Sequence, residues 1–302
     1  GAVAHCPPCA YFVARGCNHG PLFSQSMSAP LRKYANLLKN VRSWPRYLAH
    51  KWGLAHAPRF GLTLRPVPIR ATVPRSSLLT FKEIFLLEEY EPPFRRMGTE
   101  TPLVLDVGGN VGFFALYAFL RRPRAKVFSF EPVPAHFELL EEQRAAHPHF
   151  DWTALPVAVA DGAGTVDFFY DETHSSDGID PSASLFSTAQ NGAAANAPGR
   201  LRVETVGLAD WLAERGISRV DVLKLDCEGA EYPILHGLPD AVFPVIRHII
   251  AEVHPGRDAT ENTASLAHFL EKKGYRVEVH PGEILHAEHL DGGDNANSPP
   301  AA

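Results

Sequence analysis

Short apolar runs alternate with helical segments from residue 101 onwards, and this alternation limits the possible folds more than any other feature of the sequence. Five runs have the length and composition of buried strands: 103–107, 126–131, 154–159, 220–226 and 245–254. Strands that alternate with helices predict a mostly parallel sheet with helices on both faces. Such a sheet binds ligands at the carboxyl ends of its strands, near the point where the strand order reverses.

A glycine-rich turn follows the first of these strands. The segment LDVGGNVGFF places Gly108, Gly109, Asn110 and Gly112 between a strand and a helical pattern. Glycines in such a turn let the backbone approach a ligand closely. Many α/β folds turn in this way, so the glycines alone do not identify the ligand.

Two acidic residues at consecutive strand ends narrow the class of ligand. Asp106 lies two residues before the first glycine, where its charge would repel the pyrophosphate of NAD or ATP. Glu131 ends the second strand, where a carboxylate can accept hydrogen bonds from ribose hydroxyls. The pair fits S-adenosylmethionine, a cation that carries a ribose and no phosphate. The structural alternative is that Asp106 caps a helix and Glu131 lies on the surface.

A second charged group occupies VDVLKLDCEGAE, at the end of the fourth core strand. Asp226 is the predicted base that accepts the proton of a hydroxyl acceptor. Lys224 shares its strand face and is expected to orient this carboxylate or bind the acceptor oxygen. We expect Glu228 to point into the cleft and Glu231 to complement the helix dipole. A structural ion pair between Lys224 and Asp226 is the alternative interpretation.

The fifth core strand ends in AEVH, which offers two further polar side chains. Glu252 and His254 can join Asp226 and Glu228 in binding Mg²⁺ or Mn²⁺, and the metal ion would then lower the pKa of the acceptor hydroxyl. The spacing is not a tight metal signature, so this is the second mechanism. His254 is also a candidate base, although a lone histidine is more often structural.

Several segments, in this order, resemble the FkbM family of S-adenosylmethionine-dependent methyltransferases: LVLDVGGNVGFFAL, VFSFEPVP, VAVADGAGTVDFF, SASLF and VDVLKLDCEGAEYPILHGL. The resemblance covers roughly residues 81–280, and its last block is the most specific. The family usually has Ala where this chain has Gly109. The resemblance implies a Rossmann-like class I methyltransferase fold with a mostly parallel seven-stranded sheet. It also implies cofactor contacts from Pro132 and Asp161.

The same resemblance implies a reaction and a class of acceptor. The methyl group would pass to a hydroxyl of a sugar, a glycolipid, a polysaccharide or a related natural product. Methyltransferases that act on nucleic-acid bases commonly carry an Asn/Asp-Pro-Pro-aromatic block after the fourth strand, and this chain has LDCEGAE there. That difference argues against a nucleic-acid substrate.

Charge divides the chain, because residues 1–82 contain twelve Lys or Arg and no Asp or Glu. The arm can contact an anionic surface such as the periphery of a membrane, and the simpler alternative is that it docks on the protein's own acidic domain. Four parts are predicted: an added or upstream extension at 1–26, a basic helical arm and extended connector at 27–82, the methyltransferase domain at 83–287 and a disordered tail at 288–302. Residues 171–200 are the predicted lid, in which His174 and Ser184 are weaker acceptor-binding candidates.

The positions of the cysteines indicate whether the cellular compartment of the protein is oxidising or reducing. Cys6, Cys9 and Cys17 lie near the start of the chain, and a zinc site there is a weaker interpretation than a segment foreign to the domain. Cys227 is the only other cysteine, so the domain has no internal disulfide, which fits the cytoplasm. No apolar run reaches the ~18 residues of a membrane span.

Two other functions remain open at this point. An NAD-linked oxidoreductase on a Rossmann-like fold is one, although Asp106 and the spacing of the glycines argue against it. A nucleic-acid-binding or membrane-binding module built around the basic arm, with a degenerate cofactor fold, is the other.

Overall fold

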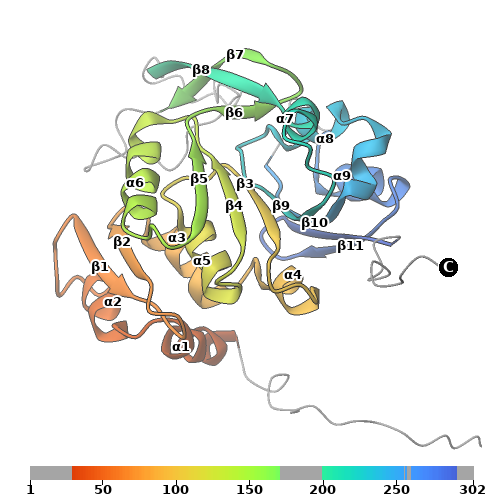
Figure 1. Cartoon of the computed structure of the whole chain (residues 1–302). Coiled ribbons are helices and arrows are strands. Elements are labelled where there is room, and N and C mark those ends of the chain that lie inside the picture. Colours follow the sequence, from red (N-terminus) through yellow and green to blue (C-terminus); the bar gives the residue numbers. More distant parts are fainter. Residues whose placement is uncertain (1–28, 171–198, 255, 257–259, 291–302) are drawn as a thin grey trace, which may run out of the picture.

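A seven-stranded sheet forms the centre of the protein, with the strand order β11-β12-β10-β9-β3-β4-β5 (Figure 1). The structure is a computed structural model, and it describes residues 29–170, 199–254, 256 and 260–290. The strands are β3 (Leu103–Val107), β4 (Lys126–Phe130), β5 (Asp151–Leu155), β9 (Val220–Leu225), β10 (Ile246–Glu252), β11 (Tyr275–His280) and β12 (Ile284–His289). The predicted Rossmann-like sheet of seven strands is therefore confirmed.

The order of the parallel strands fixes where a ligand can bind. β3 pairs in parallel with β4 on one side and with β9 on the other. The chain first runs outward from β3 to β5 and then returns to β9, so the strand order reverses between β3 and β9. Only β12 is antiparallel to its neighbours, β10 and β11. The carboxyl ends of β3 and β9 are therefore the expected ligand edge.

Alternate residues of the central strands feed two hydrophobic clusters, one on each face of the sheet. Val104 and Val222 belong to one cluster, and their neighbours Leu105 and Leu223 belong to the other. This follows from the two-residue period of a strand. The first face is covered by α5 (Phe113–Arg121) and α6 (Pro134–Ala145), and the second by α7 (Leu208–Glu214), α8 (Glu231–Gly237) and α9 (Thr263–Lys272).

The predicted strand at 154–159 is wrong as a single element. The chain leaves the main sheet at the end of β5 and forms β6 (Ala158–Ala160) in a second sheet. Pro156 lies between the two strands, and proline cannot donate a ladder hydrogen bond. The second sheet has the order β6-β8-β7, with β7 at Gly164–Tyr170 and β8 at Gly199–Gly207.

The N-terminal arm is more structured than the sequence predicts. Helices α1 (Ala29–Asn40) and α2 (Trp44–Lys51) are separated at Trp44-Pro45, as expected. The expected extended connector is wrong, because β1 (Arg59–Thr63) and β2 (Arg70–Pro74) form an antiparallel hairpin. The arm shares the first hydrophobic cluster with α5, through buried side chains that include Leu37, Val41, Tyr47, Phe60 and Phe113.

The segment between the arm and the sheet is not one continuous helix. It consists of α3 (Leu78–Lys82), a π-helix η1 (Glu83–Leu87) and α4 (Glu91–Arg96). The π-helix ends at Glu88, which has a left-handed φ of 56°. Pro92 and Pro93 lie in the first turn of α4, where the missing N–H of proline is tolerated. The prolines therefore start a helix instead of ending one.

At the C-terminal end, α9 is followed by β11 and β12. β12 reaches His289, two residues beyond the expected end of the domain at 287. Among the described residues, no helix combines the length and the apolar character required to cross a membrane. Cys6, Cys9, Cys17 and the tail from residue 291 lie outside the described residues.

Candidate active site

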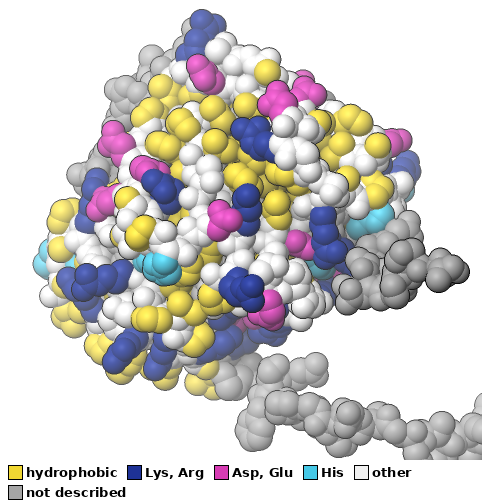
Figure 2. All heavy atoms as spheres, in the orientation of Figure 1, with side chains coloured by type: hydrophobic (Ala, Val, Ile, Leu, Met, Phe, Trp, Pro, Cys, Tyr) yellow, Lys and Arg dark blue, Asp and Glu magenta, His cyan; other side chains and the backbone are white. Residues whose placement is uncertain are grey.

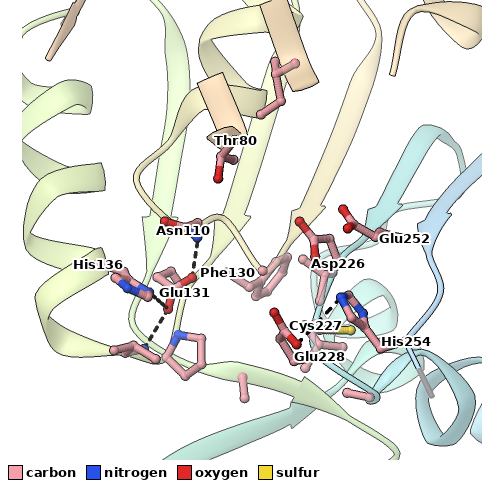
Figure 3. Close-up of a pocket in the computed structure, with 18 of the residues that line it drawn as sticks. Thr80, Asn110, Phe130, Glu131, His136, Asp226, Cys227, Glu228, Glu252 and His254 are labelled. Carbon is pink, nitrogen blue, oxygen red and sulfur yellow. Dashed lines mark hydrogen bonds and ion pairs between the residues drawn. The ribbon is translucent and has the colours of Figure 1, made fainter. Parts of the chain in front are cut away.

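A cavity opens at the carboxyl ends of β3, β4, β9 and β10, where the strand order reverses (Figure 3). Its volume is about 920 Å³ when the open mouth is included. The residues predicted for the site that line it are Gly108, Asn110, Glu131, Pro132, Asp226, Glu228, Glu252 and His254. The topology therefore brings together residues that are up to 146 positions apart in the sequence.

The glycine turn forms the floor between β3 and its neighbours. The N–H groups of Gly108 and Gly109 both donate to the carbonyl oxygen of Phe130, at 3.0 and 2.9 Å. Gly108 has a φ of +76°, and a Cβ there would lie 1.8 Å from the carbonyl oxygen of Asp226. Only glycine fits this position. At Gly109, a Cβ would meet the tip of the Leu140 side chain at 2.7 Å.

Glu131 is held at the end of β4 by the backbone. Its Oε2 accepts from the N–H of Asn110 at 2.7 Å, and its Oε1 accepts from the N–H of Val133 at 2.8 Å. Nδ1 of His136 lies 3.7 Å from Oε1. The side chain is only 4% exposed, yet it lines the cavity. This carboxylate is therefore fixed in orientation and can accept hydrogen bonds from a diol on its cavity side.

Asp106 and Lys224 are both buried and do not line the cavity. Nζ of Lys224 donates to the carbonyl oxygen of Gly108 at 2.6 Å and lies 3.4 Å from Asp106 and 3.3 Å from Asp226. Burial lowers the pKa of Lys224, but the charges of Asp226 and Asp106 outweigh it and raise this pKa. Ser129 donates to Asp106 at 2.9 Å. The cation thus ties the glycine turn to the end of β9.

On the far side of the cavity, Asp226 and Glu252 end the neighbouring strands β9 and β10 (Figure 3). The hydroxyl of Tyr90 donates to Oε2 of Glu252 at 3.3 Å. Burial and the charge of Asp226 raise the pKa of Glu252 to about 7. The shift brings the titration of Glu252 toward neutral pH, where a carboxyl group can act as either acid or base.

His254 lies between two glutamates at the right of Figure 3. Its Nδ1 is 3.1 Å from Oε1 of the fully buried Glu231, and its Nε2 is 3.7 Å from Oε2 of Glu228. Burial lowers the pKa of His254, but the hydrogen bond to Glu231 and the charge of Glu228 outweigh it and raise this pKa to about 9. The imidazole is therefore protonated at neutral pH, which opposes the prediction that it is a free base.

Glu231 has a larger role than the predicted complement to the helix dipole. It does lie in the first turn of α8, but its two oxygens also accept the N–H groups of Cys227 and Gly229, each at 2.9 Å. Glu228, between these two residues, has a left-handed φ of 53° and lines the cavity. Burial raises the pKa of Glu228 to about 7.

Three expectations do not gain support from the geometry. Asp161 is exposed and does not line the cavity. Within the described residues, no group of three or more His, Cys, Asp or Glu side chains is arranged to hold a metal ion, so the predicted Mg²⁺ or Mn²⁺ has no assembled ligand set there. His174 and Ser184 lie outside the described residues.

Twelve lining residues were not identified from the sequence, and four of them precede the main sheet: Thr80, Glu83, Ile84 and Tyr90. They come from α3, the π-helix and the turn that follows it. Burial raises the pKa of Glu83 to about 7. The resemblance reaches back to about residue 81, but nothing in the pattern of this segment indicates which side chains face a cavity.

Comparisons with known proteins agree with this geometry. The sequence profile of the Methyltransferase FkbM domain matches residues 106–277. The 31-O-demethyl-FK506 methyltransferase FkbM of Streptomyces tacrolimicus is 35% identical over 171 residues, which are 50% of this chain and 65% of the relative. The hexuronic acid methyltransferase AglP of Haloferax volcanii is 30% identical over 186 residues, covering 60% of this chain and 65% of the relative.

A third relative is the 2-O-methyltransferase NoeI of Sinorhizobium fredii, which is 30% identical over 173 residues, 54% of this chain and 65% of the relative. The chain thus spans slightly less than two thirds of the length of these three relatives. The FkbM profile nevertheless matches more than half of the chain. The protein therefore belongs to the FkbM methyltransferase family.

Proposed function

We propose that this protein is an S-adenosylmethionine-dependent O-methyltransferase that acts on a hydroxyl of a sugar, a glycolipid or polysaccharide, or a related natural product. The observation that carries the proposal is the placement of Glu131 and Asp226 on opposite sides of the glycine turn, in one cavity. Two of the three relatives are named for transfer to oxygen, and one for a hexuronic acid.

The residues of the cavity fit this cofactor. When bound, S-adenosylmethionine supplies an electrophilic methyl group on a positively charged sulfur. Glu131 is oriented by two backbone N–H groups and would accept the ribose hydroxyls. The described lining contains no Lys or Arg and has five carboxyl side chains, so it suits a cation: Glu83, Glu131, Asp226, Glu228 and Glu252.

Asp226 is the proposed base for the acceptor hydroxyl. The hydroxyl must lose its proton as its oxygen bonds to the methyl carbon, and a placed carboxylate contributes about 10²–10⁴-fold to such a step. Nζ of Lys224 lies 3.3 Å from Oδ2 of Asp226 and holds this carboxylate in place, so Lys224 acts as a positioning residue. Glu228 and Glu252 line the same cavity, and their pKa values are raised to about 7.

Calorimetric titration tests the proposal. We expect the purified protein to bind S-adenosylhomocysteine selectively, with no heat from NAD or ATP under the same conditions. Selective binding of NAD would instead establish the oxidoreductase. A folded protein that binds none of the three would contradict the proposed cofactor, and the proposal would fail.

A further inference from the structure

The N-terminal arm carries an exposed apolar surface that the cavity does not explain. Nine large hydrophobic side chains are exposed among the described residues, and six of them lie between residues 31 and 54. These six are Leu31, Tyr34, Leu38, Trp44, Trp52 and Leu54. We call them the arm patch. Single exposed hydrophobic residues are normal, but a concentration of this kind marks an interaction surface.

Helix α1 packs on the protein with one face and exposes apolar side chains on another. Leu37 of the packed face is buried in the core, as is Val41, which follows the helix. Leu31, Tyr34 and Leu38 follow the i, i+3, i+7 spacing of a second face, and they are exposed. Apolar side chains outside the packed face of a helix indicate that this second face is buried against something else.

The patch continues from α1 onto the end of α2. Nζ of Lys51, the last residue of α2, lies 5.4 Å from the centre of the Tyr34 ring, and Nζ of Lys33 lies 5.3 Å from it. Trp52 and Leu54 follow Lys51 directly and are 60% and 75% exposed. The two helices therefore present one surface in which aromatic, aliphatic and cationic groups are interleaved.

The arm itself carries charge of one sign, although Lys39 of α1 pairs with Glu88, which follows the π-helix. Residues 1–82 contain no Asp or Glu. Five cations of α1, α2 and their junction form no ion pair with any carboxylate of the described residues: Arg32, Lys33, Arg42, Arg46 and Lys51. Figure 2 shows Lys or Arg side chains beside hydrophobic ones over α1 and α2. The surface is complementary to a negatively charged partner.

We propose that the arm patch docks this protein onto the surface of a membrane that contains anionic lipids. Leu and Trp side chains beside Lys and Arg are the combination that lies at the boundary between headgroups and acyl chains. Anionic headgroups attract each nearby cation, and the apolar side chains add the binding that a purely electrostatic contact lacks. A nucleic acid would use the cations but would leave the exposed leucines without an apolar environment.

The arm is also joined to the wall of the cavity. Nδ2 of Asn36 donates to the carbonyl oxygen of Leu86 at 2.9 Å, and Nδ2 of Asn40 donates to that of Phe85 at 2.6 Å. Both carbonyls belong to the π-helix that also supplies Glu83 and Ile84 to the cavity. A docked arm would therefore hold the cavity at a fixed position relative to the membrane, which suits an acceptor whose sugar is carried on a lipid.

Vesicle flotation with the full chain tests the proposal without reference to activity. We expect the protein to float with vesicles of equal parts phosphatidylcholine and phosphatidylglycerol, to bind vesicles of phosphatidylcholine alone far more weakly, and to be released by molar salt.

The double variant Trp52→Ser/Leu54→Ser should lower the partition coefficient by about tenfold or more, because two large apolar side chains are removed. Lys33→Gln and Arg46→Gln should each lower it about fivefold.

The matched control is Val279→Ser, which removes an exposed apolar side chain on β11, outside the arm. It should float like the unaltered protein. Circular dichroism should show each variant folded. The proposal is wrong if the unaltered protein does not float, or if the arm variants float as well as Val279→Ser. It is also wrong if sedimentation shows that the patch is buried between two copies of the chain and the dimer ignores vesicles.

Discussion

Nδ1 of His254 lies 3.1 Å from Oε1 of Glu231, a carboxylate with no exposed surface. This contact joins the end of β10 to the start of α8 and leaves Nε2 of the imidazole on the side of Glu228 and the cavity. A buried carboxylate that fixes an imidazole also favours its protonated form. His254 is therefore a cation in the cavity wall.

Replacing the buried partner should change the titration of His254. In Glu231→Gln the charge that favours the imidazolium is lost, so we expect the pKa of His254 to fall below about 9. An NMR titration of the histidine ring signals measures this directly. Glu271→Gln, beside His268 on the exposed side of α9, is the control and should leave His254 unchanged. An unchanged pKa in Glu231→Gln would show that the contact does not govern the charge.

Asp226→Asn separates chemistry from cofactor binding. The amide cannot accept the hydroxyl proton, so we expect methyl transfer to fall by about 10²–10⁴-fold. The affinity for S-adenosylhomocysteine should change by less than about tenfold. Asp151→Asn, at an exposed residue that starts β5 outside the cavity, should leave both quantities unchanged. Full turnover in Asp226→Asn would move the role of base to Glu228 or Glu252.

Glu131→Gln should weaken the cofactor complex. The carboxylate loses the charge that strengthens its hydrogen bonds to ribose hydroxyls, and hydrogen bonds to charged groups contribute about 1.5–3 kcal/mol each. We expect calorimetry with S-adenosylhomocysteine to show a loss of affinity of about ten- to a hundredfold. Glu138→Gln, exposed on α6, is the matched control. Equal affinities in the two variants would refute the assignment of Glu131.

Gly108→Ala should destabilise the junction of β3 and β9. The new Cβ would lie 1.8 Å from the carbonyl oxygen of Asp226, at a φ of +76° that alanine avoids. We expect the free energy of unfolding in urea to fall by about 3 kcal/mol or more. At Gly61, nothing lies within 4 Å of an added Cβ. Gly61→Ala should therefore change the free energy of unfolding by less than about 1 kcal/mol.

The acidic cavity predicts how stability depends on pH. Burial raises the pKa values of Glu83, Glu228 and Glu252 from 4.5 to about 7, and that of His254 is raised from 6.5 to about 9. In each case the folded state binds protons more tightly than the unfolded state, so stability is greatest at low pH and is lost as pH rises through the folded pKa.

Above pH 6.5 the free energy of unfolding should therefore decline as the pH rises toward 9. Below pH 6.5, the buried His248 and His286 oppose the glutamates, because their pKa values are lowered to about 4. Urea unfolding measures the curve, and Glu83→Gln, which removes one titrating group, should make the decline near pH 7 shallower. A curve of the unaltered protein that rises between pH 7 and 9 would contradict the assignment.

The sequence was sufficient where a residue's role depends on its place at a strand end. Glu131 and Asp226 were predicted for the cavity because strand ends in a parallel sheet share one edge, and the structure places both there. Contacts between segments that are distant in the sequence could not be predicted from positions at strand ends. The pairing of His254 with Glu231 spans 23 residues. Tyr90 reaches Glu252 across 162 residues, through the packing of a segment that precedes the sheet.

The hairpin in the arm also could not be predicted from its local sequence pattern. Its many Pro and Arg residues indicated an extended connector, yet Phe60 and Val73 are buried and join the core. Partners for such side chains come from α5 and the arm helices, and they are visible only once the chain is folded. The tertiary environment therefore overrode the local pattern.

Part of the cavity wall lies outside the segment that defines the family. Thr80, Glu83, Ile84 and Tyr90 precede residue 106, where the family match begins. A chimera that exchanges only residues 106–277 with a relative would receive a new cofactor turn and new strand ends, yet it would keep this protein's own wall. To transfer the acceptor preference of one relative to another, the arm and the π-helix would therefore have to be exchanged together with the sheet.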